Sequence, residues 1–118
     1  MKTIISFLTA LLLFANLQGY SKDKPSKKTI TIHFHVPAVC SMCEMTIEKA
    51  VDVKGVVAAD YNLDSEILEI TYKPAKISED QLHHLINEVG YDTEKFRATD
   101  EQYSRVNECC RYRDMDKH

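Results

Sequence analysis

The chain has 118 residues, with 15 basic and 18 acidic side chains and a formal net charge of −3 at pH 7. This mild acidity, without a basic cluster in the folded part, argues against nucleic acid as a partner. Once the N-terminal stretch described next is set aside, the length allows one small domain.

Residues 1–19 have the pattern of a secretory signal peptide. Lys2 supplies a positive start, and an apolar run over residues 4–15 then gives way to polar and small side chains. That run is shorter than the about 20 residues that span a membrane as a helix. We therefore expect export to the periplasm or cell envelope, with no membrane insertion of the mature protein; an uncleaved N-terminal anchor is the alternative. Residues 20–28, charged and proline-containing, are expected to be a linker.

Three strands and one helix are predicted in the first half of the folded part. Residues 29–36 alternate strictly between apolar and polar side chains, which predicts a half-buried strand. Apolar residues at helical spacing over 44–53 predict a helix of about three turns, which Gly55 ends. Alternation over 56–63 and 67–73 predicts two strands, and their short polar connection makes them a hairpin.

A second helix begins at a capping box, in which Ser78 is followed three residues later by Gln81. It carries an apolar stripe and ends at Gly90, and residues 95–98 are expected to form a short edge strand. This order predicts an α+β, ferredoxin-like split βαβ sandwich (βαββαβ), with two helices on one face of an antiparallel sheet. The expected core is Ile30, Ile32, Phe34, Ile47, Val51, Ala59, Leu68, Ile70, Leu82, Leu85, Ile86 and Val89.

Cys40 and Cys43 lie between the first strand and the first helix. The unpaired N–H groups and the dipole of a helix N-terminus favour the thiolate, which binds metals or attacks disulfides. Soft thiolates select Cu(I), Hg(II) or Zn(II); two sulfurs on a loop suit Cu(I), since zinc takes four ligands. The alternative is a dithiol–disulfide oxidoreductase, against which the chain is too short for a thioredoxin fold and has no proline between the cysteines.

The tail, residues 100–118, is polar and holds one or two weak helical turns before Cys109 and Cys110. Both cysteine pairs are local, so a disulfide framework is not expected. The tail thiols either fold back to complete a three- or four-sulfur site, capture a second ion, or oxidise as an unconnected pair. Adjacent cysteines rarely bind one ion together, so one of them is expected to be a spectator.

The histidines are expected to lie away from the cysteine loop. His33 and His35 fall on the outward face of the first strand, and His83 and His84 flank the apolar stripe of the second helix. We expect all four to be solvated surface residues.

These motifs together resemble the heavy-metal-associated (HMA) domain. The resemblance rests on C-x-x-C between strand and helix, on Lys54-Gly55-Val56, and on the Gly-Tyr-Asp turn within residues 88–92. It covers residues 29–99, and the remaining tail resembles an extension found in some small exported bacterial HMA proteins. Members of the family include copper chaperones, metal-binding domains of copper-pumping ATPases and periplasmic mercury-binding proteins.

The resemblance implies that Cys40 and Cys43 hold one soft ion near the surface, with Cys109 and Cys110 as auxiliary thiols. It also implies that Tyr91 lies beside the metal loop, where its phenol shields the thiolates and donates a hydrogen bond. The expected function is that of a monomeric, non-enzymatic metallochaperone for Cu(I). A metal-transporting ATPase or another thiol metal acceptor is the expected partner, and a mercury scavenger of the cell envelope is the alternative.

One departure from the family concerns the residues before the first cysteine. The family has Gly-Met-Thr there, whereas this chain has Pro37-Ala38-Val39. We expect Met42 or Met45 to fill the space that the family methionine occupies beneath the loop.

Overall fold

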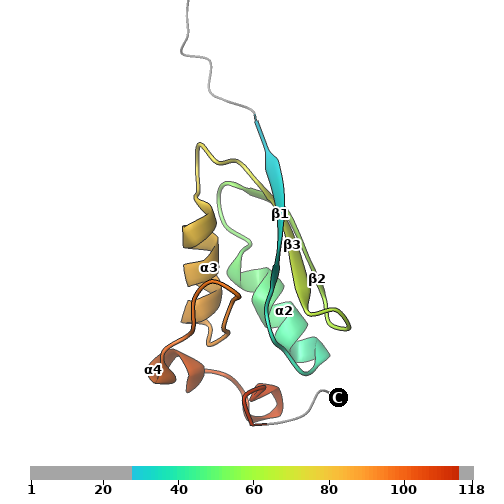
Figure 1. The fold of residues 1–118 in the computed structure, drawn as a ribbon, viewed down its shortest axis with the longest axis vertical. Coiled ribbons are helices and arrows are strands. Elements are labelled where there is room, and N and C mark those ends of the chain that lie inside the picture. Colours follow the sequence, from blue (N-terminus) through green and yellow to red (C-terminus); the bar gives the residue numbers. More distant parts are fainter. Residues whose placement is uncertain (1–27, 115–118) are drawn as a thin grey trace, which may run out of the picture.

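The computed structural model describes residues 28–114; the predicted signal peptide and most of the linker lie outside the described residues. Three antiparallel strands form a sheet of order β1-β3-β2, and two ten-residue helices pack on one of its faces (Figure 1). A short helix and a 3₁₀ turn follow. The elements are β1 (Ile30–His35), α2 (Ser41–Ala50), β2 (Val56–Asn62), β3 (Ile67–Tyr72), α3 (Glu79–Glu88), α4 (Asp100–Tyr103) and η1 (Glu108–Cys110).

The strand register places the expected apolar side chains on the helix-covered face. Phe34 of β1 and Tyr61 of β2 both lie opposite Leu68 of β3, and all three side chains are buried. Their sequence neighbours point the other way, as alternation requires. His33, for example, lies opposite Glu69 on the exposed face, with its Nε2 2.9 Å from Glu69 Oε2. The predicted fold class is confirmed.

Local sequence signals fix the ends of α3. The Ser78 side chain accepts a hydrogen bond from the Gln81 backbone N–H, and the Gln81 side chain accepts one from the Ser78 N–H, which is the predicted capping box. Gly90 follows the helix with a φ of +101°, a conformation that costs glycine little. Leu82 and Ile86 of the predicted stripe are completely buried.

The predicted edge strand at residues 95–98 is wrong, because this segment runs as a loop. The Thr93 hydroxyl accepts hydrogen bonds from the backbone N–H groups of Lys95 and Phe96, and the Thr93 N–H donates to the Phe96 carbonyl. These local bonds take backbone groups that a strand would need. Glu94 instead contacts the edge of β1 by exchanging two hydrogen bonds with His35.

His83 also departs from the expectation, since it is buried rather than exposed. Its ring stacks on Phe34 with centroids 4.0 Å apart, and its Nδ1 lies 2.6 Å from the Thr93 hydroxyl. Burial lowers its pKa, so the ring is neutral near pH 7. His33, His35 and His84 are exposed, as expected.

Some side chains of the predicted core are less buried than expected, and the core includes residues nearer the C-terminus. Ile30, Ile32, Ala59, Leu85 and Val89 are only partly buried. The core also includes side chains outside the expected list. Val36, Tyr61 and Tyr72 lie on the apolar faces of the predicted strands, and the other additions are Ile77, Tyr91, Val106 and Cys110.

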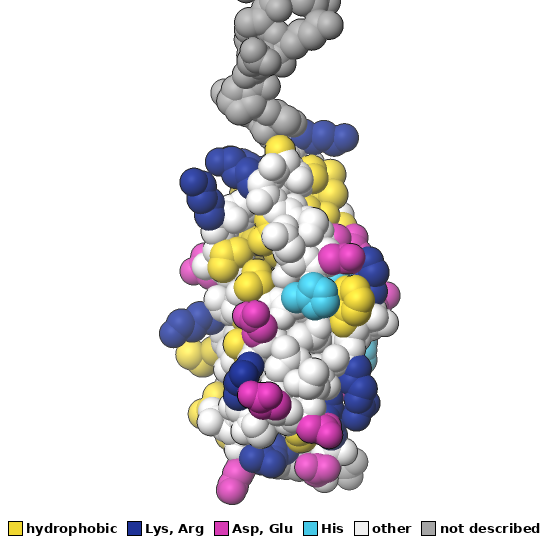
Figure 2. All heavy atoms as spheres, turned by 90° about the vertical axis from the view of Figure 1, so that its left-hand side faces the viewer, with side chains coloured by type: hydrophobic (Ala, Val, Ile, Leu, Met, Phe, Trp, Pro, Cys, Tyr) yellow, Lys and Arg dark blue, Asp and Glu magenta, His cyan; other side chains and the backbone are white. Residues whose placement is uncertain are grey.

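The surface carries mixed charge. On the face drawn in Figure 2, acidic and basic side chains are interspersed over the α3 side of the molecule. No helix within residues 28–114 is long and apolar enough to cross a membrane.

Candidate metal centre

Cys40 is the N-cap residue of α2, directly before its first residue, Ser41. Its backbone is extended, and its carbonyl accepts hydrogen bonds from the N–H groups of Cys43 at 3.0 Å and Glu44 at 3.3 Å. Cys43 lies in the first helical turn, four residues before Ile47, and both side chains are completely buried. Cys40 is half-buried, so one sulfur of the pair reaches the surface and the other lies in the core.

Small apolar residues support the loop before Cys40. Ala38 and Val39 are 2% and 3% exposed, and they form the buried base of the loop. Met42 and Met45 are 47% and 71% exposed, so the expectation that one of them fills this space is wrong. Both lie on the solvent side of α2, because the inward positions are taken by Cys43 and Ile47.

The tail folds back and brings a third sulfur to this pair. The Cys110 Sγ lies 3.1 Å from the Cys40 Sγ, which is itself 3.6 Å from the Cys43 Sγ. All three sulfurs lie within 4.8 Å of one another. Cys109 is exposed and outside this cluster, with its Sγ 3.8 Å from the Cys110 Sγ. One tail cysteine therefore joins the predicted pair and its neighbour does not.

The turn after α3, residues 90–92, forms the surface against which the tail packs. Tyr112 stacks on Tyr91 with ring centroids 5.3 Å apart. The Tyr112 hydroxyl donates to the Gly90 carbonyl at 2.8 Å and accepts from the Asp92 N–H at 2.9 Å. The Gly-Tyr-Asp turn thus contacts the tail through each of its three residues. In Figure 1 the tail crosses the end of the molecule where β1 leads into α2.

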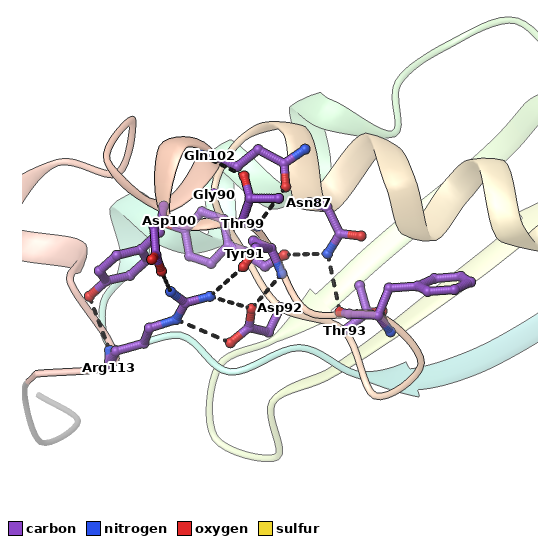
Figure 3. A network of polar contacts seen from close by, with 12 residues as sticks. Asn87, Gly90, Tyr91, Asp92, Thr93, Thr99, Asp100, Gln102 and Arg113 are labelled. Carbon is purple, nitrogen blue, oxygen red and sulfur yellow. Dashed lines mark hydrogen bonds and ion pairs between the residues drawn. The ribbon is translucent and has the colours of Figure 1, made fainter.

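Arg113 also attaches the tail to this turn, through hydrogen bonds and an ion pair (Figure 3). Its guanidinium donates to Asp92 Oδ1 and to the Ala98 carbonyl, each at 2.8 Å, and its Nη1 lies 3.7 Å from Asp100 Oδ1. The Arg113 and Asp92 side chains are only 15% and 17% exposed, so water screens this pair weakly. Arg113 lies three residues after Cys110, so this ion pair helps to fix the position of the Cys110 sulfur.

Two of the clustered thiols, Cys40 and Cys110, have shifted pKa values. Burial alone would raise the pKa of Cys40, but hydrogen bonds from the Cys110 thiol and from the Cys43 and Met42 backbone outweigh it and lower the pKa to about 7. Burial raises the pKa of Cys110, as do its hydrogen bonds to Cys43 and Cys40. Near pH 7 the cluster therefore contains a substantial fraction of Cys40 thiolate that accepts a hydrogen bond from the Cys110 thiol.

Tyr91 lies against the sulfurs, as the family resemblance implied. The side chain is 1% exposed. Burial, followed by hydrogen bonding to Cys43, raises the pKa of Tyr91 well above its ordinary value, so the phenol keeps its proton and can donate it in a hydrogen bond. Tyr91 therefore covers one side of the cluster.

The arrangement can hold a soft metal ion. With a metal–sulfur bond of about 2.3 Å, two sulfurs on opposite sides of one ion lie about 4.6 Å apart, and three in a plane around it about 4.0 Å apart. The three sulfurs here all lie within 4.8 Å of one another, close to these spacings. A buried cluster of thiols with a lowered pKa on its outer member suits Cu(I), Hg(II) or another thiophilic ion.

No pattern in the sequence marks Tyr112 and Arg113 as residues that position Cys110. One signal for an ordered tail was present, because Thr99 and Gln102 form a second capping box at the start of α4. It marks the start of a helix but not the surface against which that helix packs. No local pattern marks the stacking of Tyr112 on Tyr91.

A match to a known protein family covers two of the three clustered sulfurs. Residues 33–92 match the model of the family described as the heavy-metal-associated domain. The match includes Cys40, Cys43 and Tyr91 and ends before the two tail cysteines.

Individual relatives support the same assignment. The copper chaperone CopZ of Staphylococcus aureus is 32% identical over 54 residues, which are 45% of this chain and 79% of that protein. Oxidized MerP from Ralstonia metallidurans superimposes with a TM-score of 0.54 at 30% identity, over 57% of this chain and 96% of MerP. The N-terminal domain of a potential copper-translocating P-type ATPase from Bacillus subtilis, in the Cu(I)-loaded state, has a TM-score of 0.54 at 26% identity, over 56% and 85% of the two chains.

Proposed function

This chain belongs to the heavy-metal-associated domain family, and we propose that it binds one Cu(I) ion and passes it to another protein that has thiolate ligands. The ligands are Cys40, Cys43 and Cys110. The observation that carries the proposal is the cluster of three sulfurs, half-buried to buried, at the start of α2. The chain acts as a metal carrier and makes or breaks no bond in an organic substrate.

The number and spacing of the sulfurs favour Cu(I). The 3.6 Å between the Cys40 and Cys43 sulfurs is shorter than the about 4.6 Å of a linear site, and a third sulfur stands beside them. A structural zinc site takes four ligands, and Cys109 is not placed to supply the fourth. Three thiolates around a monovalent soft ion satisfy the preference of Cu(I) for sulfur.

Transfer proceeds by ligand exchange, without change in the oxidation state of copper. The incoming thiol of the acceptor loses its proton and bonds to the ion as a fourth ligand. One of the original sulfurs then leaves and takes up that proton. Cys40 is half-buried and Cys43 completely buried, so the acceptor first meets the ion on the Cys40 side, and Cys43 is the last ligand to leave.

The proposed acceptor is a metal-binding domain of a metal-transporting ATPase or a similar thiol protein. The similarity to a domain of a copper-translocating ATPase supports this proposal, because a shared fold lets two such loops meet face to face. We further propose that the protein is exported and acts as a monomer in the cell envelope. Export rests on the signal pattern of residues 1–19, and N-terminal sequencing of the protein recovered from a cell fraction tests it.

Competition titration tests the central proposal. The reduced protein is titrated with Cu(I) against a Cu(I)-specific chelator, and the coordination number is measured by X-ray absorption. The wild type should bind one ion with three sulfur neighbours. The double variant Cys40→Ser/Cys43→Ser should lose this ion, and Cys110→Ser should bind it with two sulfurs and lower affinity. Glu108→Gln, an exposed neighbour of the tail cysteines, is the control. Undiminished binding by the double variant would refute the proposal.

Mercury is the second candidate cargo, and the similarity to MerP is the observation that favours it. The same three sulfurs would bind Hg(II), which is also thiophilic. Parallel competition titrations with the two ions distinguish the cargoes by their relative affinities. Efficient turnover in the reduction of insulin disulfides would instead favour the dithiol–disulfide oxidoreductase.

A further inference from the structure

A second pair of sulfurs lies outside the three-thiol cluster, at its entrance. The Cys109 Sγ lies 3.6 Å from the Met42 Sδ, and both side chains are exposed. Met42 belongs to α2 and Cys109 to η1, so the pair joins residues 67 positions apart in the sequence. The three-thiol site of the proposed function does not use either sulfur.

The contacts around Met42 hold its thioether at this place. The Asn107 side-chain amide donates to the Met42 sulfur at 3.3 Å, and the Cys109 thiol is directed to the same sulfur. Two polar groups of the tail thus converge on one thioether. Met45 lies three residues further along α2 and is 71% exposed, and within residues 28–114 its sulfur accepts no hydrogen bond from Asn107 or Cys109.

The outer pair is continuous with the inner cluster. From Met42 through Cys109, Cys110 and Cys40 to Cys43, successive sulfurs are 3.6, 3.8, 3.1 and 3.6 Å apart. Each distance is below the about 4.6 Å that separates two sulfurs bonded to one ion from opposite sides. An ion can therefore pass along this series by exchanging one sulfur at a time, without a stage at which it has no ligand.

We propose that Met42 and Cys109 form an outer Cu(I) station, through which the ion enters and leaves the site made by Cys40, Cys43 and Cys110. This rests on the proposed function of the inner site. The outer station has one thiolate and one uncharged thioether, so it binds Cu(I) more weakly than three thiolates do. It also discriminates by metal, because zinc in proteins takes thiolate, imidazole and carboxylate ligands rather than thioether.

Transfer through the station leaves charge and protons balanced. Cu(I) from a carrier bonds to the Cys109 sulfur, whose proton passes to the released carrier ligand. With the ion held by the Cys109 thiolate and the Met42 thioether, Cys110 bonds to it as the Met42 thioether leaves. Cys109 leaves in turn as the Cys40 and Cys43 sulfurs bond, and it takes up the proton that Cys110 loses, while a proton lost by Cys43 passes to water. No oxidant or reductant takes part, and copper remains Cu(I) throughout.

Rapid-mixing kinetics test the proposal. A Cu(I)–chelator complex is mixed with the reduced full chain, and loading is followed through the chelator absorbance. Met42→Leu and Cys109→Ser should each slow loading about tenfold, as loss of a residue adjacent to a metal site commonly does. Both should keep one tightly bound ion with three sulfur neighbours. Met45→Leu, which removes an exposed sulfur from the same helix, should load at the wild-type rate.

NMR spectroscopy tests where a second Cu(I) ion binds. With methyl-labelled methionine, a second equivalent of Cu(I) should shift the Met42 methyl resonance and leave that of Met45 unchanged, and Cys109→Ser should abolish the shift. Wild-type loading rates in Met42→Leu and Cys109→Ser, or no shift at Met42, would overturn the outer station while the inner site still binds its ion. Failure of the wild type to bind a first equivalent would refute the proposed function instead.

Discussion

At the scale of single residues, Cys40 and Cys110 are coupled by one hydrogen bond. Their sulfurs are 3.1 Å apart, and the pKa of Cys40 is lowered while that of Cys110 is raised. The thiol of Cys110 therefore stabilises the thiolate of Cys40 before any metal arrives. A preformed thiolate at the more exposed ligand favours capture of a cation, since that ligand need not first lose a proton.

Removal of Cys110 should raise the pKa of Cys40. In Cys110→Ala the donor is absent, so the pKa of Cys40 should rise from about 7 toward 9.0. The measurement is the pH profile of Cys40 alkylation in the metal-free protein, followed by mass spectrometry of its peptide. Cys109→Ala, which leaves the Cys110 donor in place, is the control. An unchanged midpoint in Cys110→Ala would contradict the hydrogen bond.

The same shift predicts how stability depends on pH. The folded-state pKa of Cys40 lies below its ordinary value of 9.0, so the stabilisation is fully present above 9.0 and is lost as the pH falls through about 7. The free energy of unfolding of the reduced, metal-free protein should therefore rise between pH about 6 and about 8, by more than it does in Cys40→Ser. Urea unfolding at both pH values with reductant measures the difference. Equal slopes in the two proteins would contradict the prediction.

At the scale of elements, the segment from α4 to η1 acts as one unit that carries Cys110. It is fixed by the Tyr91–Tyr112 stack, by Arg113 on Asp92, and by Val106, which is 4% exposed and lies against Gly90. The family turn after α3 is thus used here as a docking surface for the tail. The position of the third sulfur depends on contacts made at both ends of the segment.

Gly90→Ala should separate the tail from the metal loop. The φ of +101° is unfavourable for alanine, and the added Cβ would lie 2.3 Å from Val106 Cγ2 and 2.8 Å from the Gln102 carbonyl. We expect a loss of about 1–3 kcal/mol of stability from the backbone conformation alone, and faster reaction of Cys110 with a thiol reagent. Urea unfolding and reagent kinetics measure the two effects.

Gly55→Ala provides a matched control for that experiment. Gly55 has nearly the same φ, +103°, but its added Cβ would meet Ile77 and Lys76, away from the tail. It should lose stability without exposing Cys110. If both variants expose Cys110 equally, the reactivity reports general destabilisation and the docking role of Gly90 is wrong.

At the scale of the whole molecule, the three-sulfur site joins two parts of the chain that are distant in sequence. Cys40 and Cys110 are separated by 70 positions, and the family match ends at residue 92. An ion shared by Cys40, Cys43 and Cys110 would therefore cross-link the tail to the domain. Binding to the folded state alone also stabilises that state by mass action.

Cu(I) loading should for this reason slow amide hydrogen exchange in residues 99–114. The slowing should be seen at one equivalent in the wild type and should be lost in Cys110→Ser, in which the ion remains on α2 alone. Exchange followed by mass spectrometry, with and without Cu(I), measures it. Equal protection of the tail in Cys110→Ser would show that the tail is not attached through the metal.

Local patterns in the sequence determined most of the architecture. Alternation in β1 and β3, the Ser78–Gln81 capping box and the Leu82–Ile86 stripe each depend on neighbours within a few residues, and all three are seen in the structure. The Cys40–Cys43 pair was marked by its place between a strand and a helix, and Tyr91 by the family resemblance. Such patterns can be recognised without knowledge of the fold, because the residues that interact are close together in the sequence.

Contacts that no sequence pattern marked decided the rest, some of them local and others between distant residues. Whether 95–98 joins the sheet depended on Thr93, the burial of His83 depended on Phe34, and the space beneath the loop was taken by Ala38 and Val39 rather than by a methionine. The choice of Cys110 over Cys109 was settled by Tyr112 and Arg113, which dock on a turn about 20 residues earlier. The sequence by itself determined a two-thiol loop on a split βαβ frame; only the tertiary structure, through packing of the tail, made it a cluster of three.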